Sequence, residues 1–171
     1  MEDLLKVSNL NTEFKSDYGS KPALNNISFN IKEGEVLALV GESGSGKTVT
    51  SLSIMGLLPN NASVENGEIK LFSKKNKEIN ILNLSDEKHN EIRGNDISMV
   101  FQEPMTCLNP TMTVGEQILE VIIRHKKISK INAKKEMIGL LELVEIPDPI
   151  QISIEYPHQL SGGMRQRIMI A

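Results

Sequence analysis

The sequence has one cysteine, no long hydrophobic run and no large excess of charge of either sign. Because Cys107 is alone, an internal disulfide and a metal site built from several cysteines are both excluded. No apolar run approaches the roughly 20 residues that a membrane-spanning helix needs, and the acidic start of the chain is unlike a signal peptide. The 19 Lys and Arg residues stand against 22 Asp and Glu residues, and this balance gives no support to nucleic-acid binding. We therefore expect a soluble, cytoplasmic protein, and 171 residues are enough for one domain.

The most informative stretch is an apolar run that leads into a glycine-rich loop. The run covers 36–40 and is typical of a strand that is buried on both faces in a parallel sheet. The next residues, GESGSGKT (Gly41–Thr48), fit the G-x-x-x-x-G-K-[ST] pattern of a phosphate-binding loop. Its glycines let backbone N–H groups turn toward an anion, while Lys47 can reach the β- and γ-phosphates and Thr48 can bind Mg²⁺. The alternative is a plain turn between a strand and a helix. The buried strand before the loop and the helical pattern after it favour a nucleotide site.

Hydrophobic alternation predicts an antiparallel sheet in the N-terminal half of the chain. Strands are expected over 4–14, 24–32, 67–72 and 79–82. The polar turn from Lys15 to Pro22 holds Tyr18, which either stacks on a nucleobase or packs against its own loop. A second two-sided strand, 97–101, delivers Gln102 at its carboxyl end, the side of an open α/β sheet on which ligands bind.

Capping signals and apolar stripes predict helices, most of them in the C-terminal half. The expected helices cover about 46–58, 85–93, 113–125 and 129–144, and a final helix begins after Ser161. Thr113 and Glu116 have the spacing of a capping box, and prolines between 147 and 157 mark a loop. The basic residues of the pair 113–144 are either its solvated outer face or a surface for a partner or for lipid headgroups.

A second candidate anion site lies at the start of the final helix. Ser161 is its expected N-cap, and the N–H groups of Gly162 and Gly163 are exposed there, with no lysine or metal ligand nearby in the motif. A lone Ser-Gly-Gly is weak evidence, because many helices begin in this way. It gains weight as the last member of an ordered series: an aromatic turn, a phosphate loop, a glutamine at a strand end, and then LSGGMRQR.

This series resembles the nucleotide-binding subunit of ATP-binding cassette (ABC) transporters. The stretches GESGSGKTVTSLSIMGLLP, MVFQEPMTCLNPTMTVGEQI and YPHQLSGGMRQRIMIA are similar to the ATPases of peptide importers, a group that also includes nickel importers. The resemblance implies an α/β P-loop NTPase fold with an N-terminal antiparallel β subdomain and a helical insertion. It assigns 1–102 to the β subdomain and part of the P-loop core, 103–160 to the helical subdomain, and 161–171 to the start of the signature helix.

The resemblance also implies cofactors, partners and the role of each site residue. Tyr18 matches the adenine-stacking aromatic, and Gln102 matches the Q-loop glutamine, which binds Mg²⁺ together with Thr48. The residues that it places on ATP are Tyr18, Gly41, Glu42, Ser43, Gly44, Ser45, Gly46, Lys47, Thr48, Gln102, Ser161, Gly162, Gly163 and Gln166. The implied partners are membrane permease subunits and a second ATP-binding subunit in a head-to-tail dimer, at the cytoplasmic face of the cell membrane.

The sequence departs from the family pattern at its end. In the family, the Walker B aspartate, the catalytic glutamate and the switch histidine follow the signature motif, and the chain ends before these positions. We therefore expect this chain alone to bind nucleotide at most, without hydrolysing it. The strands at 36–40 and 97–101 are expected to have open edges, because later strands lie between them in the family. The alternatives are a nickel importer ATPase and a non-transport ABC ATPase.

Overall fold

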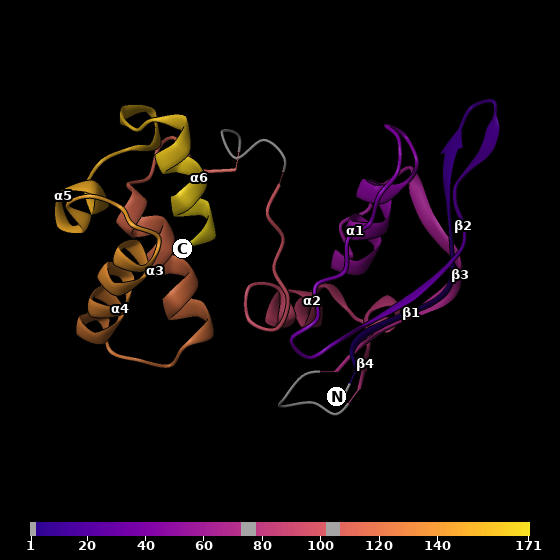
Figure 1. Cartoon of the computed structure of the whole chain (residues 1–171), viewed down its shortest axis with the longest axis horizontal. Helices are drawn as coiled ribbons and strands as arrows, with labels where there is room; N and C mark the ends of the chain where they lie inside the picture. Colours follow the sequence, from indigo (N-terminus) through magenta and orange to yellow (C-terminus); the bar gives the residue numbers. More distant parts are fainter. Residues whose placement is uncertain (1–2, 73–77, 102–106) are drawn as a thin grey trace. The chain divides into compact units, whose positions relative to one another are not determined.

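A computed structural model describes residues 3–72, 78–101 and 107–171 of the chain (Figure 1). The chain forms two compact units, unit 1 up to Ile97 and unit 2 from Ser98 onward, and each has its own hydrophobic core. Gln102 and the charged turn expected at 74–77 lie outside the described residues.

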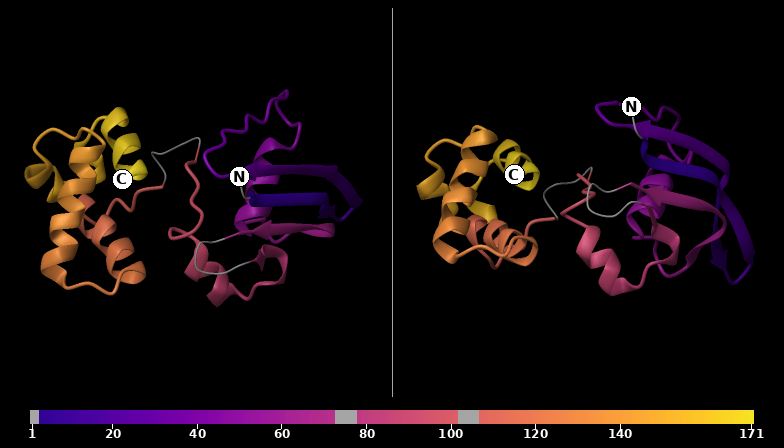
Figure 2. Two further views of the ribbon diagram at one scale, coloured as in Figure 1. Left: turned by 60° about the horizontal axis from the view of Figure 1, so that its bottom comes forward. Right: turned by 90° about the horizontal axis from the view of Figure 1, so that it is seen from below.

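Unit 1 is built on a four-stranded antiparallel sheet. Across the sheet the strands are β2 (Gly19–Lys32), β1 (Asp3–Ser16), β3 (Ala62–Leu71) and β4 (Ile79–Asn80). Figure 2 shows the long strands running side by side. Alternation along β1 buries Leu5 and Val7, as the period-two pattern predicts. A bulge beside Asn9, whose φ is 49°, then shifts the pattern by one residue, so that Leu10 and Thr12 are the next buried residues. The antiparallel β subdomain is therefore present.

One helix, α1 (Lys47–Met55), packs against this sheet (Figure 1). Ser53 of α1 and Thr12 of β1 are both almost completely buried, and their hydroxyl oxygens lie 3.4 Å apart. Ser53 Oγ also donates to Val49 O at 2.8 Å. Because both buried hydroxyls have a partner, the contact holds α1 over β1 without leaving an unsatisfied polar atom. Two short elements, η1 (Ile81–Asn83) and α2 (Asp86–Ile92), complete unit 1.

Unit 2 is helical in its described part. It contains α3 (Val114–His125), α4 (Lys130–Leu143), α5 (Pro149–Ser153), η3 (Pro157–Gln159) and α6 (Gly162–Ile170). The predicted capping box is confirmed: Thr113 Oγ1 accepts from the N–H of Glu116 at 3.3 Å, and Glu116 Oε2 accepts from the N–H of Thr113 at 2.8 Å. The core of unit 2 is formed by Val114, Ile118, Ile122, Ala133, Met137, Leu141, Ile146, Leu160 and Ile168.

The two predicted two-sided strands are wrong for this structure. Residues 35–40 form no strand, and Val36 and Val40 are 95 % and 90 % exposed. In the other segment Ile97 makes only an isolated bridge with Arg93, and Phe101 is 41 % exposed. A strand of this kind needs a hydrogen-bonded neighbour and a layer over each face. Within the described residues no strand pairs with either segment, so most of their apolar side chains stay uncovered, although Ile97 packs against the core of unit 1.

Other predicted boundaries also change. The strand expected over 67–72 is β3, which begins at Ala62. β2 begins at Gly19, so the turn expected over 15–22 shrinks to Asp17 and Tyr18. The strand expected at 79–82 pairs at only two residues and then continues as η1. The proline loop contains α5 and η3, because proline at the first helical position needs no N–H partner and pre-sets the helical φ. Asp148 Oδ1 caps α5 by accepting from the N–H of Gln151 at 3.3 Å.

Replacement of leucine by alanine at a buried and at an exposed position of α4 tests the burial pattern of this helix. Leu141 is fully buried in the core of unit 2, whereas Leu143 near the end of the same helix is 77 % exposed. Leu141→Ala should lower the free energy of unfolding by about 2–5 kcal/mol, because it leaves a cavity in packed surroundings. Leu143→Ala should change it by no more than about 0.5 kcal/mol. Urea unfolding followed by far-UV circular dichroism measures both, and equal losses would contradict the packing described.

Candidate phosphate-binding site

The glycine-rich loop enters α1 through a helix start that no side chain caps. Gly46 is the N-cap, with a left-handed φ of 92°, and no acidic residue lies in the first turn. By contrast, Thr113, Ser129 and Ser161 each cap their own helix with a side-chain oxygen. The first N–H groups of α1 therefore keep their positive potential, which suits an anion.

Lys47 folds back over the loop and brings its positive charge to the same place. Its Nζ donates to Gly41 O at 2.7 Å, to Glu42 O at 2.6 Å and to Ser45 Oγ at 3.2 Å. These three acceptors match the three hydrogens of the ammonium group. In the part of the chain that the structure describes, no carboxylate pairs with Lys47. The charge is thus held in position by neutral oxygens and is not neutralised.

Two glycines of the loop stand where a larger residue does not fit. A Cβ on Gly46 would lie 2.6 Å from Leu24 Cδ2 and 3.1 Å from Ala23 O, in addition to the strain of its positive φ. A Cβ on Gly41 would lie 2.5 Å from Ser45 Oγ, an acceptor for Lys47. The close approach at Gly46 holds the end of the loop against β2.

The hydroxyl of Thr48 differs from the other hydroxyls of α1. Thr50, Ser51 and Ser53 each donate to the backbone carbonyl one turn earlier, at 3.0, 3.2 and 2.8 Å. Thr48 is exposed, and among the described residues its hydroxyl has no hydrogen-bond partner. An available oxygen in the first turn, beside the anion site, fits a ligand of a hard cation such as Mg²⁺. Elsewhere in the described chain, no cluster of three or more His, Cys, Asp or Glu residues could hold a metal.

Tyr18 lies at the tip of the β1–β2 hairpin and is fully exposed. The turn is closed beneath it by Ser16 Oγ, which donates to Gly19 O at 2.9 Å. The alternative that Tyr18 packs against its own loop is therefore wrong. Its ring is available to a planar ligand, and it is on the strand pair against which the phosphate loop packs through Gly46 and Leu24.

The second candidate anion site lies in unit 2, at the start of α6. Ser161 Oγ accepts from the N–H of Met164 at 3.3 Å, which confirms Ser161 as the N-cap. Gly162 and Gly163 are exposed, and a Cβ on either would meet nothing within 4 Å. The packing of the described chain therefore does not require glycine at these positions. Gln166 is also exposed on α6.

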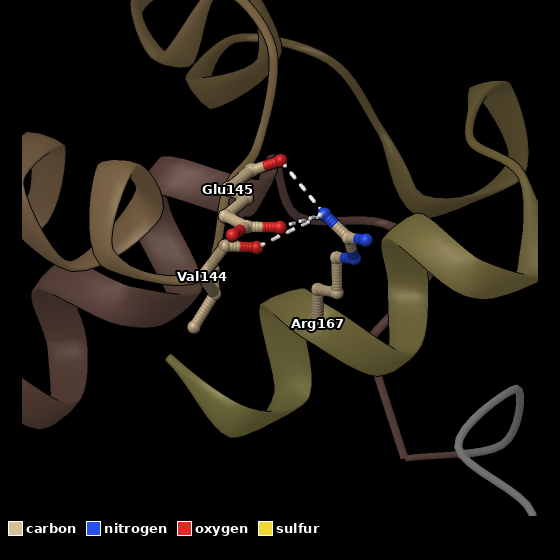
Figure 3. Close-up of polar contacts among 3 residues, drawn as sticks. All are labelled: Val144, Glu145 and Arg167. Carbon is tan, nitrogen blue, oxygen red and sulfur yellow. Dashed lines mark hydrogen bonds and ion pairs between the residues drawn. The ribbon is translucent and has the colours of Figure 1, made fainter.

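Arg167 anchors α6 to the end of α4, a contact that sequence analysis missed. Its Nη1 donates to Glu145 O at 2.9 Å and to Val144 O at 3.4 Å, and it lies 3.5 Å from Glu145 Oε2 (Figure 3). A cation at this end of α4 satisfies carbonyls that the helix leaves unpaired. The partners are more than 20 residues apart in sequence, so no periodic pattern predicts the contact.

A buried histidine of α2, His89, packs against the C-terminal end of α1, and the sequence did not single it out. The ring of His89 lies against Gly56, whose Cβ, if present, would be 2.5 Å from His89 Cε1. Nδ1 of His89 is buried and has no hydrogen-bond partner among the described residues. Burial, followed by the like charge of Arg93, lowers the pKa of His89 from its ordinary value, although Asp86 acts in the opposite direction. The ring borders a cavity of about 550 Å³ that includes no residue of the phosphate loop.

The glycine-rich loop and the uncapped helix start that follows it are typical of the P-loop class of proteins. Residues 24–171 match the sequence model of a family described as "ABC transporter". The chain therefore belongs to the ABC transporter family, and its fold is that of an ABC-type nucleotide-binding domain.

Relatives and solved structures agree with this family. The dipeptide transport ATP-binding protein DppD of Bacillus subtilis (strain 168) is 55 % identical over 172 residues, which cover 100 % of this chain and 50 % of DppD. The oligopeptide transport ATP-binding protein AppD of the same organism is 49 % identical, and the match covers 100 % of this chain and 51 % of AppD. The dimeric bacterial ABC transporter cassette MJ0796 is 30 % identical with a TM-score of 0.79, and the match covers 97 % of this chain and 67 % of that one. The chain thus spans about half the length of the curated relatives it matches.

Replacement of glycine by alanine should have opposite effects on the free energy of unfolding at Gly46 and at Gly139. Gly46→Ala should lower the free energy of unfolding by about 1–3 kcal/mol, because alanine is strained at this φ and its Cβ meets Leu24. Gly139→Ala, inside α4 where a Cβ meets nothing within 4 Å, should raise it by about 1 kcal/mol through helix propensity. Urea unfolding measures both, and destabilisation by Gly139→Ala or tolerance of Gly46→Ala would contradict the geometry.

The lowered pKa of His89 predicts a loss of stability in mild acid. The unfolded chain takes up a proton at this residue near pH 6.5, its ordinary pKa, before the folded chain does. The contribution of His89 is therefore fully present above about pH 6.5 and is lost as the pH falls toward the folded pKa, by at most about 1.4 kcal/mol per pH unit. Unfolding free energies between pH 7.5 and 5 should fall less steeply in His89→Gln than in the wild type. A slope in His89→Gln equal to that of the wild type would contradict the assignment.

Proposed function

We propose that this chain carries the ATP-binding core of the ATPase subunit of an ABC importer for oligopeptides or dipeptides. One observation carries the proposal: the start of α1 is uncapped, and the ammonium group of Lys47 is held over the loop that precedes it. The relatives DppD and AppD, named for dipeptide and oligopeptide transport, support the class of cargo. Because other subunits select the cargo, the proposal covers both oligopeptides and dipeptides.

In this proposal the loop binds the phosphates of ATP. The N–H groups from Gly44 to Thr48 face the anion, and Lys47 exchanges its carbonyl contacts for oxygens of the β- and γ-phosphates. Thr48 and Gln102 are the residues that would hold Mg²⁺, and the ion would supply positive charge to neutralise the phosphates. The exposed ring of Tyr18 is placed on the adenine. Hydrolysis by the longer protein is phosphoryl transfer to water, for which positioning and charge neutralisation matter more than covalent chemistry.

A second ATP-binding subunit is the proposed partner of Ser161, Gly162, Gly163 and Gln166. The packing of this chain does not require glycine at positions 162 and 163, and both lie at an exposed helix start. Because glycine has no side chain, a ligand bound to a second subunit can approach the backbone there. The cassette MJ0796 is dimeric, and in one of its solved structures it is bound to ADP and Pi. Membrane permease subunits are the other proposed partners, with this chain at the cytoplasmic face of the membrane. In the described part, no helix is long and apolar enough to span a bilayer.

Replacement of Lys47 tests the nucleotide site. Lys47→Ala should weaken MgATP binding by roughly 2–5 kcal/mol, the range for truncating one partner of a desolvated charge pair. Adenosine, which has no phosphates, should bind both proteins alike. Isothermal titration calorimetry on folded protein measures the MgATP affinities, with Lys6→Ala, an exposed lysine of β1, as the matched control. Equal MgATP affinity in the wild type and Lys47→Ala would remove the basis of the proposal.

A further inference from the structure

We propose that Arg93 is a positioning residue for the phosphate-binding helix. Its guanidinium group holds the C-terminal end of α1, at the opposite end of the helix from Lys47 and Thr48. The inference rests on the proposed nucleotide site, because it concerns how the donors of that site are kept in place. Arg93 itself has no contact with the phosphate loop among its described hydrogen bonds.

The contact has the geometry of a fork on two neighbouring carbonyls. Nε of Arg93 donates to Met55 O at 2.9 Å, and Nη2 donates to Gly56 O at 2.6 Å. Met55 is the last residue of α1, and Gly56 ends the helix with a left-handed φ of 62°. Carbonyls at a helix end lack partners within the helix, and the planar guanidinium group can bind two of them at once. A lysine in the same place presents all its donors from one nitrogen.

Arg93 also supplies charge that α1 lacks. The first turn of α1 contains no acidic residue and its last turn contains no basic one. The helix dipole therefore has a positive end free for an anion and a negative end without a cation of its own. Arg93 places a positive charge at that negative end from outside the helix. This arrangement stabilises α1 without a side chain that competes for its N-terminal N–H groups.

The residue that makes this contact is itself held rigidly. Arg93 ends α2, and in the turn that follows, the N–H groups of Asn95, Asp96 and Ile97 converge on the carbonyl of Ile92, at 3.2, 2.8 and 3.2 Å. Ile92 is buried in the core of unit 1, together with residues of β1 and β3. Arg93 thus ties the end of α1 to the sheet core through a fixed turn. This differs from a contact made by a mobile surface arginine.

A helix end fixed in this way determines where the other end points. α1 has 9 residues and is therefore a rod of about 14 Å, so a tilt at Met55 moves the N–H groups beside Lys47. The contact of Ser53 with Thr12 and the close approach of Gly46 to Leu24 hold the side and the start of the helix. Arg93 adds the third point, at the end. Without it, the loop donors are less well preorganised for a triphosphate, while a site for adenine on the hairpin is unaffected.

The test compares MgATP and adenosine binding in the full chain and in Arg93→Ala, Arg93→Lys, Lys88→Ala and Lys47→Ala. Calorimetry measures MgATP, and ligand-observed NMR measures the weaker binding of adenosine, both well below the lowest unfolding midpoint. Arg93→Ala should raise the Kd for MgATP roughly two- to thirtyfold, the range for mutations that alter coupling at a distance. The Kd for adenosine should not change. Arg93→Lys should fall between Arg93→Ala and the wild type, and Lys88→Ala, an exposed lysine of α2, should match the wild type.

The outcomes separate this inference from the proposed function. If Lys47→Ala weakens MgATP binding and Arg93→Ala does not, the inference is overturned and the nucleotide site stands. If Lys47→Ala has no effect either, the proposed function fails as well. An equal loss of MgATP and adenosine in Arg93→Ala shows a general structural role and overturns the inference. If Arg93→Ala does not fold, Arg93→Lys decides, because wild-type affinity for MgATP in that variant contradicts the need for the fork.

Discussion

The uncapped start of α1 is the constraint on which unit 1 depends. A helix usually satisfies its first N–H groups with a side-chain oxygen, and several helices of unit 2 do so. α1 begins instead with Gly46, and the positive end of the helix faces the loop next to Lys47. A site that keeps its donors open for a ligand forgoes the stability of a side-chain cap, roughly a few tenths of a kcal/mol when glycine is the N-cap. The helix must then be held by contacts elsewhere along its length.

Those contacts are polar as well as apolar. The buried hydroxyl of Ser53 meets Thr12 of β1, and Gly46 lies so close to Leu24 that a Cβ does not fit. At the far end, Arg93 binds the carbonyls of Met55 and Gly56. A misplaced apolar helix can slide with little loss, whereas a buried hydroxyl or a forked guanidinium group loses its partner when it moves. Polar contacts therefore specify the position of α1 more sharply than its apolar face does.

The two units use an arginine in the same way. In unit 1, Arg93, the C-cap of α2, donates to carbonyls at the end of α1. In unit 2, Arg167 of α6, the helix that begins at Ser161, donates to carbonyls at the end of α4 (Figure 3). Both helices that carry a candidate anion site are thus connected by an arginine to a neighbouring helix of their own unit. Guanidinium groups suit this task because they present several donors in one plane and stay charged.

The sequence by itself determined the glycine-rich loop before a helix, the family, one capping box and the alternating strands of the sheet, because each depends on residues close together in the chain. Gly41–Thr48, Thr113 with Glu116, and the alternation along β1 are signals of this kind. The tertiary structure alone decided the burial of His89, the contacts of Arg93 and Arg167, and the exposure of Val36 and Val40. An apolar run predicts that a segment can be buried, but burial also needs a neighbouring strand and a covering layer. Those neighbours lie far away in sequence, and no local pattern states whether the described chain provides them.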